Sequence, residues 1–209
     1  MKATRLKELI LHVTEKTGPV SRLKLAKLVY LIDWSFYRRH GRPLTKAYYL
    51  RERRGPVPAT FGKDLEEMMG FEIELKRGAV APGIRRRFTP SFDEAEASVI
   101  DEVLRRYGRR SERDLLVATY VSKPMKALLK EERAGSVRKH EGISFGRFPS
   151  EAHDRGSADR DEAPAEGRFE YVAPGQITAG DTRELMLGFL EALPLVMTAQ
   201  ELLGDDMET

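Results

Sequence analysis

The segment from Tyr48 to Phe61, YYLRERRGPVPATF, gathers residue types that are well suited to binding a partner. Arginine and tyrosine are enriched at protein–protein hot spots, and guanidinium groups and flat aromatic rings also suit contact with nucleic acid. The candidate partner-binding residues are Tyr48, Tyr49, Arg51, Arg53 and Arg54. The alternative interpretation is a solvated charged loop with no binding role.

The candidates are followed by Gly55-Pro56-Val57-Pro58. A phosphate-binding loop needs backbone N–H groups, which Pro56 and Pro58 lack. Each proline fixes its own φ and pushes the residue before it out of the helical region. We therefore expect a rigid structural turn here, which leads the chain from a long second helix to a third.

The rest of the sequence shows no catalytic or metal-binding pattern. There are no cysteines, and none of the four histidines lies at a metal-ligand spacing from another ligand. The glycine-rich nucleotide-binding patterns and the Gly-x-Ser-x-Gly elbow are also missing. The adjacent acids Glu66-Glu67 and Asp93-Glu94 fit solvated helix surfaces. We expect a protein without enzyme activity, cofactor or metal.

The elements that must position the candidate residues begin with two helices. Leu6, Leu9, Ile10 and Val13 recur at helical spacing until Gly18-Pro19 ends the pattern. A second helix over residues 22–39 is apolar almost all round, which is typical of a central buried helix. Ser21 is its expected N-cap.

The middle of the chain predicts a third helix over residues 59–69 and then a β-hairpin over residues 71–88. The segments FEIELK and IRRRF alternate like strands, with the loop RGAVAPG between them. Capping patterns at Ser91-x-x-Glu94 and Ser111-x-x-Asp114 predict two further helices. Another short helix is expected over residues 123–133.

The chain changes character after Phe148. Residues 149–180 are polar, acidic and without period, which predicts a flexible linker. Residues 181–203 predict an amphipathic helix that docks either on the main domain or on a partner. Residues 1–60 carry 14 Lys and Arg against four Asp and Glu, a net charge of +10, so the remainder carries −7 of the total of +3. No apolar run approaches the ~20 residues of a membrane span, and we expect a cytoplasmic protein.

Several pieces of the first 148 residues together resemble the Panacea domain family, the SocA-like antitoxins. They follow one another as LAKLVYL, Asp-Trp, Gly-Arg-Pro-Leu-Thr and Gly-Pro-Val-Pro, and later TYVSKPMKALL and ISFGRF. Members often have an aromatic residue just before Gly-Pro-Val, where this chain has Arg53 and Arg54. The matching motif residues, taken as structural, are Leu25, Lys27, Leu28, Tyr30, Leu31, Asp33, Trp34, Gly41, Pro43, Leu44, Thr45, Gly55, Pro56, Val57 and Pro58.

The resemblance implies a non-enzymatic antitoxin that binds and neutralises a toxin, usually encoded beside it. Some members of the family are associated with phages or mobile elements. The alternative is a nucleic-acid-binding, winged-helix-like regulator, because Arg85, Arg86 and Arg87 could form a basic wing. No helix suits a DNA groove, since the second is too apolar and the third carries Asp64, Glu66 and Glu67.

The expected fold is α+β and mainly helical, with about six helices packed around the buried second helix and a small hairpin near residues 71–88. The Panacea-like domain would span residues 1–148.

Overall fold

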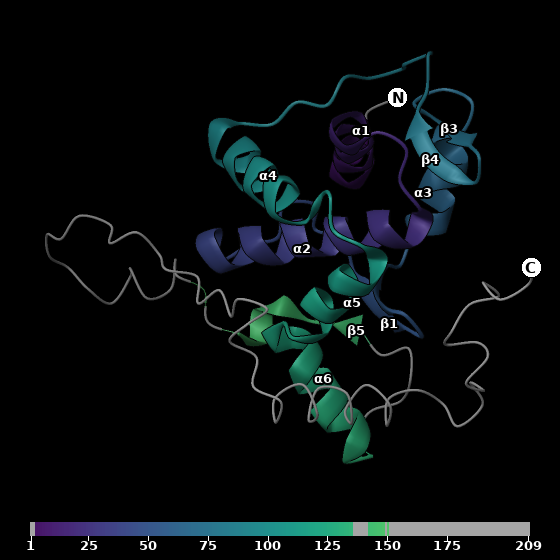
Figure 1. Ribbon diagram of the computed structural model, residues 1–209. Coiled ribbons are helices and arrows are strands. Elements are labelled where there is room, and N and C mark those ends of the chain that lie inside the picture. Colours follow the sequence, from purple (N-terminus) through teal and green to yellow (C-terminus); the bar gives the residue numbers. More distant parts are fainter. Residues whose placement is uncertain (1–2, 136–141, 149, 151–209) are drawn as a thin grey trace, which may run out of the picture. The chain divides into compact units, whose positions relative to one another are not determined.

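The computed structural model describes residues 3–135, 142–148 and 150 of the 209-residue chain. Contacts divide the chain into two units, 1–159 and 160–209, and the second lies wholly outside the described residues. The predicted linker, apart from Ser150, and the predicted helix over 181–203 also lie outside them. The described part contains six α-helices, two small antiparallel sheets and one 3₁₀ turn, which confirms a mainly helical α+β fold (Figure 1).

Helix α2, Arg22–His40, is the centre of this fold. Its N-cap is the predicted Ser21, whose side chain accepts from the Lys24 N–H at 3.1 Å. Twelve of its residues are buried, as expected for a helix that is apolar almost all round. Figure 1 shows α1 (Arg5–Thr17) and α4 (Glu94–Tyr107) on one side of α2, and α5 (Glu112–Tyr120) and strand β1 on the other.

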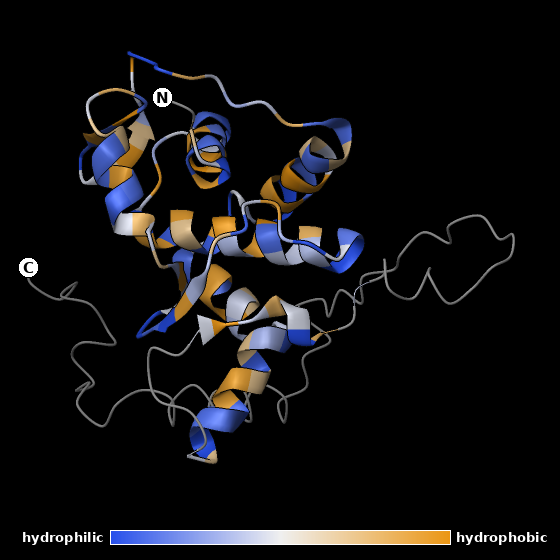
Figure 2. Ribbon diagram, turned by 180° about the vertical axis from the view of Figure 1, so that it is seen from behind, coloured by the Kyte–Doolittle hydropathy of each residue, from blue (hydrophilic) through white to orange (hydrophobic). Residues whose placement is uncertain are grey.

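Apolar residues of α1, α2 and α4 form much of a single core (Figure 2). The start of α4 differs from the prediction, because its capping box is formed by Asp93 and Glu96 and not by Ser91 and Glu94. Glu96 is also the carboxylate that pairs with Arg5 of α1. The same residue, Glu96, therefore completes the N-terminal cap of α4 and links α4 to α1.

The predicted turn at Gly55–Pro58 is wrong, since these residues form strand β2. They pair antiparallel with β1, Tyr49–Glu52, and Arg53-Arg54 make the turn between the two strands. Strand β5, Gly142–Ile143, pairs with the other edge of β1, so β2 lies at the edge of the sheet. An edge is the position in a sheet that tolerates proline.

The second sheet confirms a hairpin within residues 71–88 but corrects its second strand. Strand β3, Ile73–Lys76, pairs with β4, Ala79–Pro82, whereas IRRRF is not a strand. The turn is Arg77-Gly78, with φ values of 51° and 79°. Two residues with positive φ match the twist of a tight hairpin, so the chain reverses earlier than the alternation suggested.

The remaining elements close the core around α2. They are α3 (Phe61–Met68), α6 (Lys123–Arg133) and the 3₁₀ turn η1 (Phe145–Arg147). Phe145 packs against the rings of Tyr30, Trp34 and Tyr49 at 5.4–5.6 Å between centroids. Trp34 therefore belongs to the core. Within the described part, no helix has the length and apolar character needed to cross a membrane.

Candidate functional site

The hairpin β1–β2 carries the five candidate residues, and the structure separates them into two groups. Tyr48 is 61% exposed, and Arg53 and Arg54 are exposed at the turn. Tyr49 and Arg51 are buried, at 1% and 6% exposure, because β1 turns alternate side chains toward α2 and α6. The exposed binding candidates are thus Tyr48, Arg53 and Arg54, while Tyr49 and Arg51 hold the hairpin in place.

Asp33 of α2 is the centre of the contacts that hold β1. Its Oδ1 accepts from the Thr45 N–H at 2.8 Å, and its Oδ2 accepts from the Thr45 hydroxyl. The Tyr49 hydroxyl donates to the same Oδ2 at 2.7 Å. Complete burial raises the pKa of Asp33, and these hydrogen bonds partly oppose the rise. The motif positions Asp33 and Thr45 and the binding candidate Tyr49 thereby form one network.

Lys27 holds the second strand of the hairpin. Its side chain is fully buried, and Nζ donates to the Pro56 carbonyl at 2.8 Å. Burial lowers the pKa of Lys27 to about 7, with the Glu52 carboxylate acting in the opposite direction. The Ala59 N–H donates to the Tyr48 carbonyl, so this pair of opposed residues is hydrogen-bonded. Bonded and non-bonded pairs alternate along an antiparallel ladder, so the Arg51–Pro56 pair exchanges no hydrogen bonds. A residue of a non-bonded pair points its backbone groups away from the partner strand. Position 56 can therefore be a proline, and the Pro56 carbonyl points outward to Lys27.

Gly55 lets the hairpin approach α5 closely. Its φ is +84°, and a Cβ there would lie 3.1 Å from Tyr120 Cε2 and 3.4 Å from Lys27 Nζ. Both the backbone conformation and the space therefore favour glycine at the start of β2. Tyr120 and Lys27 therefore pack against Gly55, the residue that follows the exposed turn of Arg53 and Arg54.

Two further contacts join the hairpin region to the last described elements. Arg51 Nε lies 3.2 Å from Glu132 Oε1 of α6, a buried ion pair without hydrogen-bond geometry. The Tyr30 hydroxyl shares a 2.7 Å hydrogen bond with Ser122, just before α6. Neither pairing was predicted, because each joins residues about 80 to 90 positions apart and no local pattern marks it.

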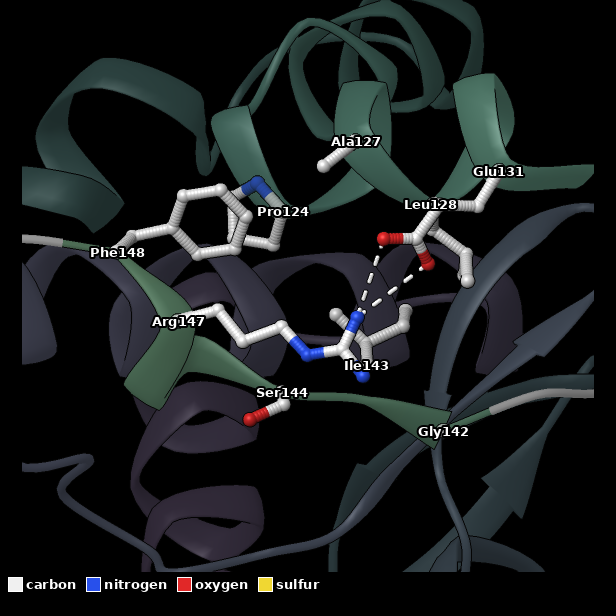
Figure 3. A pocket seen from close by; sticks show the side chains of 9 residues that line it. All are labelled: Pro124, Ala127, Leu128, Glu131, Gly142, Ile143, Ser144, Arg147 and Phe148. Carbon is white, nitrogen blue, oxygen red and sulfur yellow. Dashed lines mark hydrogen bonds and ion pairs between the residues drawn. The ribbon is translucent and has the colours of Figure 1, made fainter. Parts of the chain in front are cut away.

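The network has no access for a substrate. Lys27, Asp33 and Tyr49 are at most 1% exposed. The pocket in Figure 3, between α6 and residues 142–148, holds about 20 Å³, room for about one water. The Arg147–Glu131 ion pair, at 3.2 Å, spans it. Among the described residues no group of His, Cys, Asp and Glu could hold a metal ion.

The predicted basic wing is largely neutralised by partners. Arg87 Nη2 lies 2.7 Å from Glu72 Oε2, and Arg86 pairs with Glu15 of α1. Of the three arginines, Arg85 is the one without an ion pair in the part of the chain that the structure describes. A wing needs its arginines for phosphates, so these pairs weigh against nucleic-acid binding at this hairpin.

One protein family is similar to the part of the chain that contains this site. Residues 25–124 match the model of the SocA-like antitoxin family, the Panacea domain. This stretch of the chain is similar to the Panacea domain. The matched segment begins in α2, includes both hairpins, and ends at the start of α6. It contains Lys27, Asp33, Thr45 and Tyr49, so the buried network lies within the matched segment.

No curated protein and no solved structure matches the chain significantly. The extension of the domain to residues 1–148 stays a prediction.

Proposed function

We propose that this protein is an antitoxin that neutralises a cognate toxin by binding it directly. The Panacea domain supports the antitoxin class. The observation that carries the binding site is the β1–β2 hairpin, which a buried network holds rigid while Tyr48, Arg53 and Arg54 stay exposed. A rigid loop loses little conformational entropy when it binds. The proposed role requires no catalysis.

The first test is co-expression with the product of the adjacent gene. We expect that product to stop growth when expressed alone, and growth to return when this chain is added. The two proteins should then co-purify as a stoichiometric complex. A neighbour that is harmless and forms no complex would contradict the proposal for that gene pair.

The binding site is tested by the double variant Arg53→Glu, Arg54→Glu. Arg51 is left unchanged, because replacing it would break the buried contact with Glu132 and confuse folding with binding. The matched control is Arg109→Glu, Arg110→Glu, which changes the charge equally at two exposed residues between α4 and α5. We expect the hairpin variant to lose rescue and to weaken toxin affinity by at least about tenfold, as for loss of hot-spot contacts.

The control pair should rescue growth like the wild type. Equal affinities of the two variants for the toxin, with both folded by circular dichroism, would show that Arg53 and Arg54 do not form the contact.

A further inference from the structure

Strand β3 has an edge that no strand of the described part covers. The N–H and C=O of Val80 in β4 both bond to Val20, at 2.8 Å each, and so point away from β3. Leu75 is the register partner of Val80. Opposed residues in an antiparallel pair exchange either both hydrogen bonds or neither, so the Leu75 N–H and C=O point outward on the other side.

The edges of β2 and β4, in contrast, are closed. The outward positions of β2 are Pro56 and Pro58, which lack an N–H, and the Pro56 carbonyl is bound by Lys27. Val20 covers the edge of β4. On β3 the Gly70 N–H binds the Ile73 carbonyl, which leaves the stretch from Glu74 to Lys76 open. A short, accessible strand edge can pair with an extended segment of another chain.

Exposed apolar side chains gather at the same hairpin. Phe71, Leu75 and Ile84 are 40%, 49% and 93% exposed, and they are three of the six large apolar residues exposed in the described part. An open depression of about 170 Å³ adjoins β3 and is lined by Gly70, Phe71, Ile73, Glu74, Gly83, Ile84 and Arg85. The Arg87 guanidinium lies 4.2 Å from the centre of the Phe71 ring and holds one face of it.

The charge of residues 71–88 indicates which kind of segment could pair with the β3 edge. Residues 71–88 contain five Lys and Arg and two Glu, a net charge of +3. Within the described residues, Arg77 and Arg85 are exposed and form no ion pair. A second copy of this chain would place one +3 region against another. An acidic segment would instead meet unpaired arginines.

We propose that the β3 edge binds an extended acidic segment of a partner protein by strand addition. The segment pairs with Leu75 N–H and C=O, seats an apolar side chain in the depression, and places carboxylates near Arg77 and Arg85. This surface is separate from the β1–β2 hairpin, which lies on the other side of α2 (Figure 1). The inference therefore does not depend on the partner being a toxin.

The test uses a fluorescein-labelled, acetylated peptide of alternating Glu and Val, with fluorescence anisotropy against the full chain. Leu75→Pro removes the outward N–H and leaves the β3–β4 ladder intact, because Leu75 exchanges no bonds with β4. Leu75→Ala keeps that N–H and is the matched control. We expect about a tenfold weaker affinity for Leu75→Pro and less than a threefold change for Leu75→Ala. A Lys–Val peptide should bind the wild type at least about tenfold more weakly.

The proposal is overturned if the Glu–Val peptide does not bind, or if it binds both variants equally. It is also overturned if the wild type is a dimer in solution and Leu75→Pro is a monomer, because a second copy then occupies the edge. If Leu75→Pro does not fold, two peptides N-methylated at alternate amides replace it. One of the two should lose binding to the wild type and the other should keep it, and equal binding of both overturns the proposal. No toxin takes part, so these results are independent of the co-expression test.

Discussion

Lys27 places an ionisable side chain where water does not reach. Its side chain donates a hydrogen bond to the Pro56 carbonyl, and burial lowers its pKa to about 7. Between pH ~7 and the unfolded value near 10.5, the unfolded chain carries a proton that the folded chain does not. The contribution of Lys27 to folding stability therefore becomes more favourable as the pH rises through this window.

We predict that the stability of the wild type relative to Lys27→Met rises with pH. The increase should approach about 1.4 kcal/mol per pH unit between pH ~7 and ~10. Methionine also leaves the Pro56 carbonyl without its donor, a cost of about 1–3 kcal/mol that does not depend on this titration. Urea unfolding of both proteins at pH 6.5, 8 and 9.5 measures the difference. Parallel pH profiles would show that Lys27 titrates normally.

Among the elements, hairpin β1–β2 depends on its glycine. Gly55→Ala puts a Cβ at positive φ and into contact with Tyr120 and Lys27, which should cost about 1–2 kcal/mol of unfolding free energy. The control is Gly62→Ala in α3, where nothing lies within 4 Å of the new Cβ and φ is ordinary. We expect the control to be neutral or slightly stabilising in thermal unfolding. Equal melting temperatures for the two variants would contradict this account of Gly55.

At the scale of the whole molecule, the hydrophobic core that the described residues form runs from Leu6 to Phe145. Residues 149–209 carry 14 acidic residues and four arginines, so residues 1–148 carry a net charge of +13. We predict that a chain ending at Ser150 folds cooperatively, because it keeps every core residue of the described part. Its melting temperature should lie within a few degrees of that of the full chain at 0.15 M salt, where charges are screened beyond about 8 Å. Non-cooperative melting, followed by circular dichroism, would contradict the predicted domain boundary.

The sequence by itself determined most helices and the central place of α2. Helical periodicity and caps such as Ser21 and Ser111 are local signals, carried by residues three or four positions apart. The sequence also pointed to the segment after α2 as part of the domain, since several of the Panacea-like motifs follow one another there. The cap of α4 lay two residues from its predicted place, where a contact with α1 favours Glu96.

Only the tertiary structure decided which residues of the Tyr48–Phe61 segment face outward and where the strands lie. Arg51 looked like an exposed contact, but its partner Glu132 lies 81 positions away. Strand β2 was predicted to be a turn, because two prolines argue against a strand in the middle of a sheet. The prolines are compatible with β2 because it lies at the edge of its sheet. The pairing of Leu75 with Val80, and of Val80 with Val20, decided which edge stays open. Strand pairing and burial join residues far apart in the chain, so no short stretch of sequence contains them.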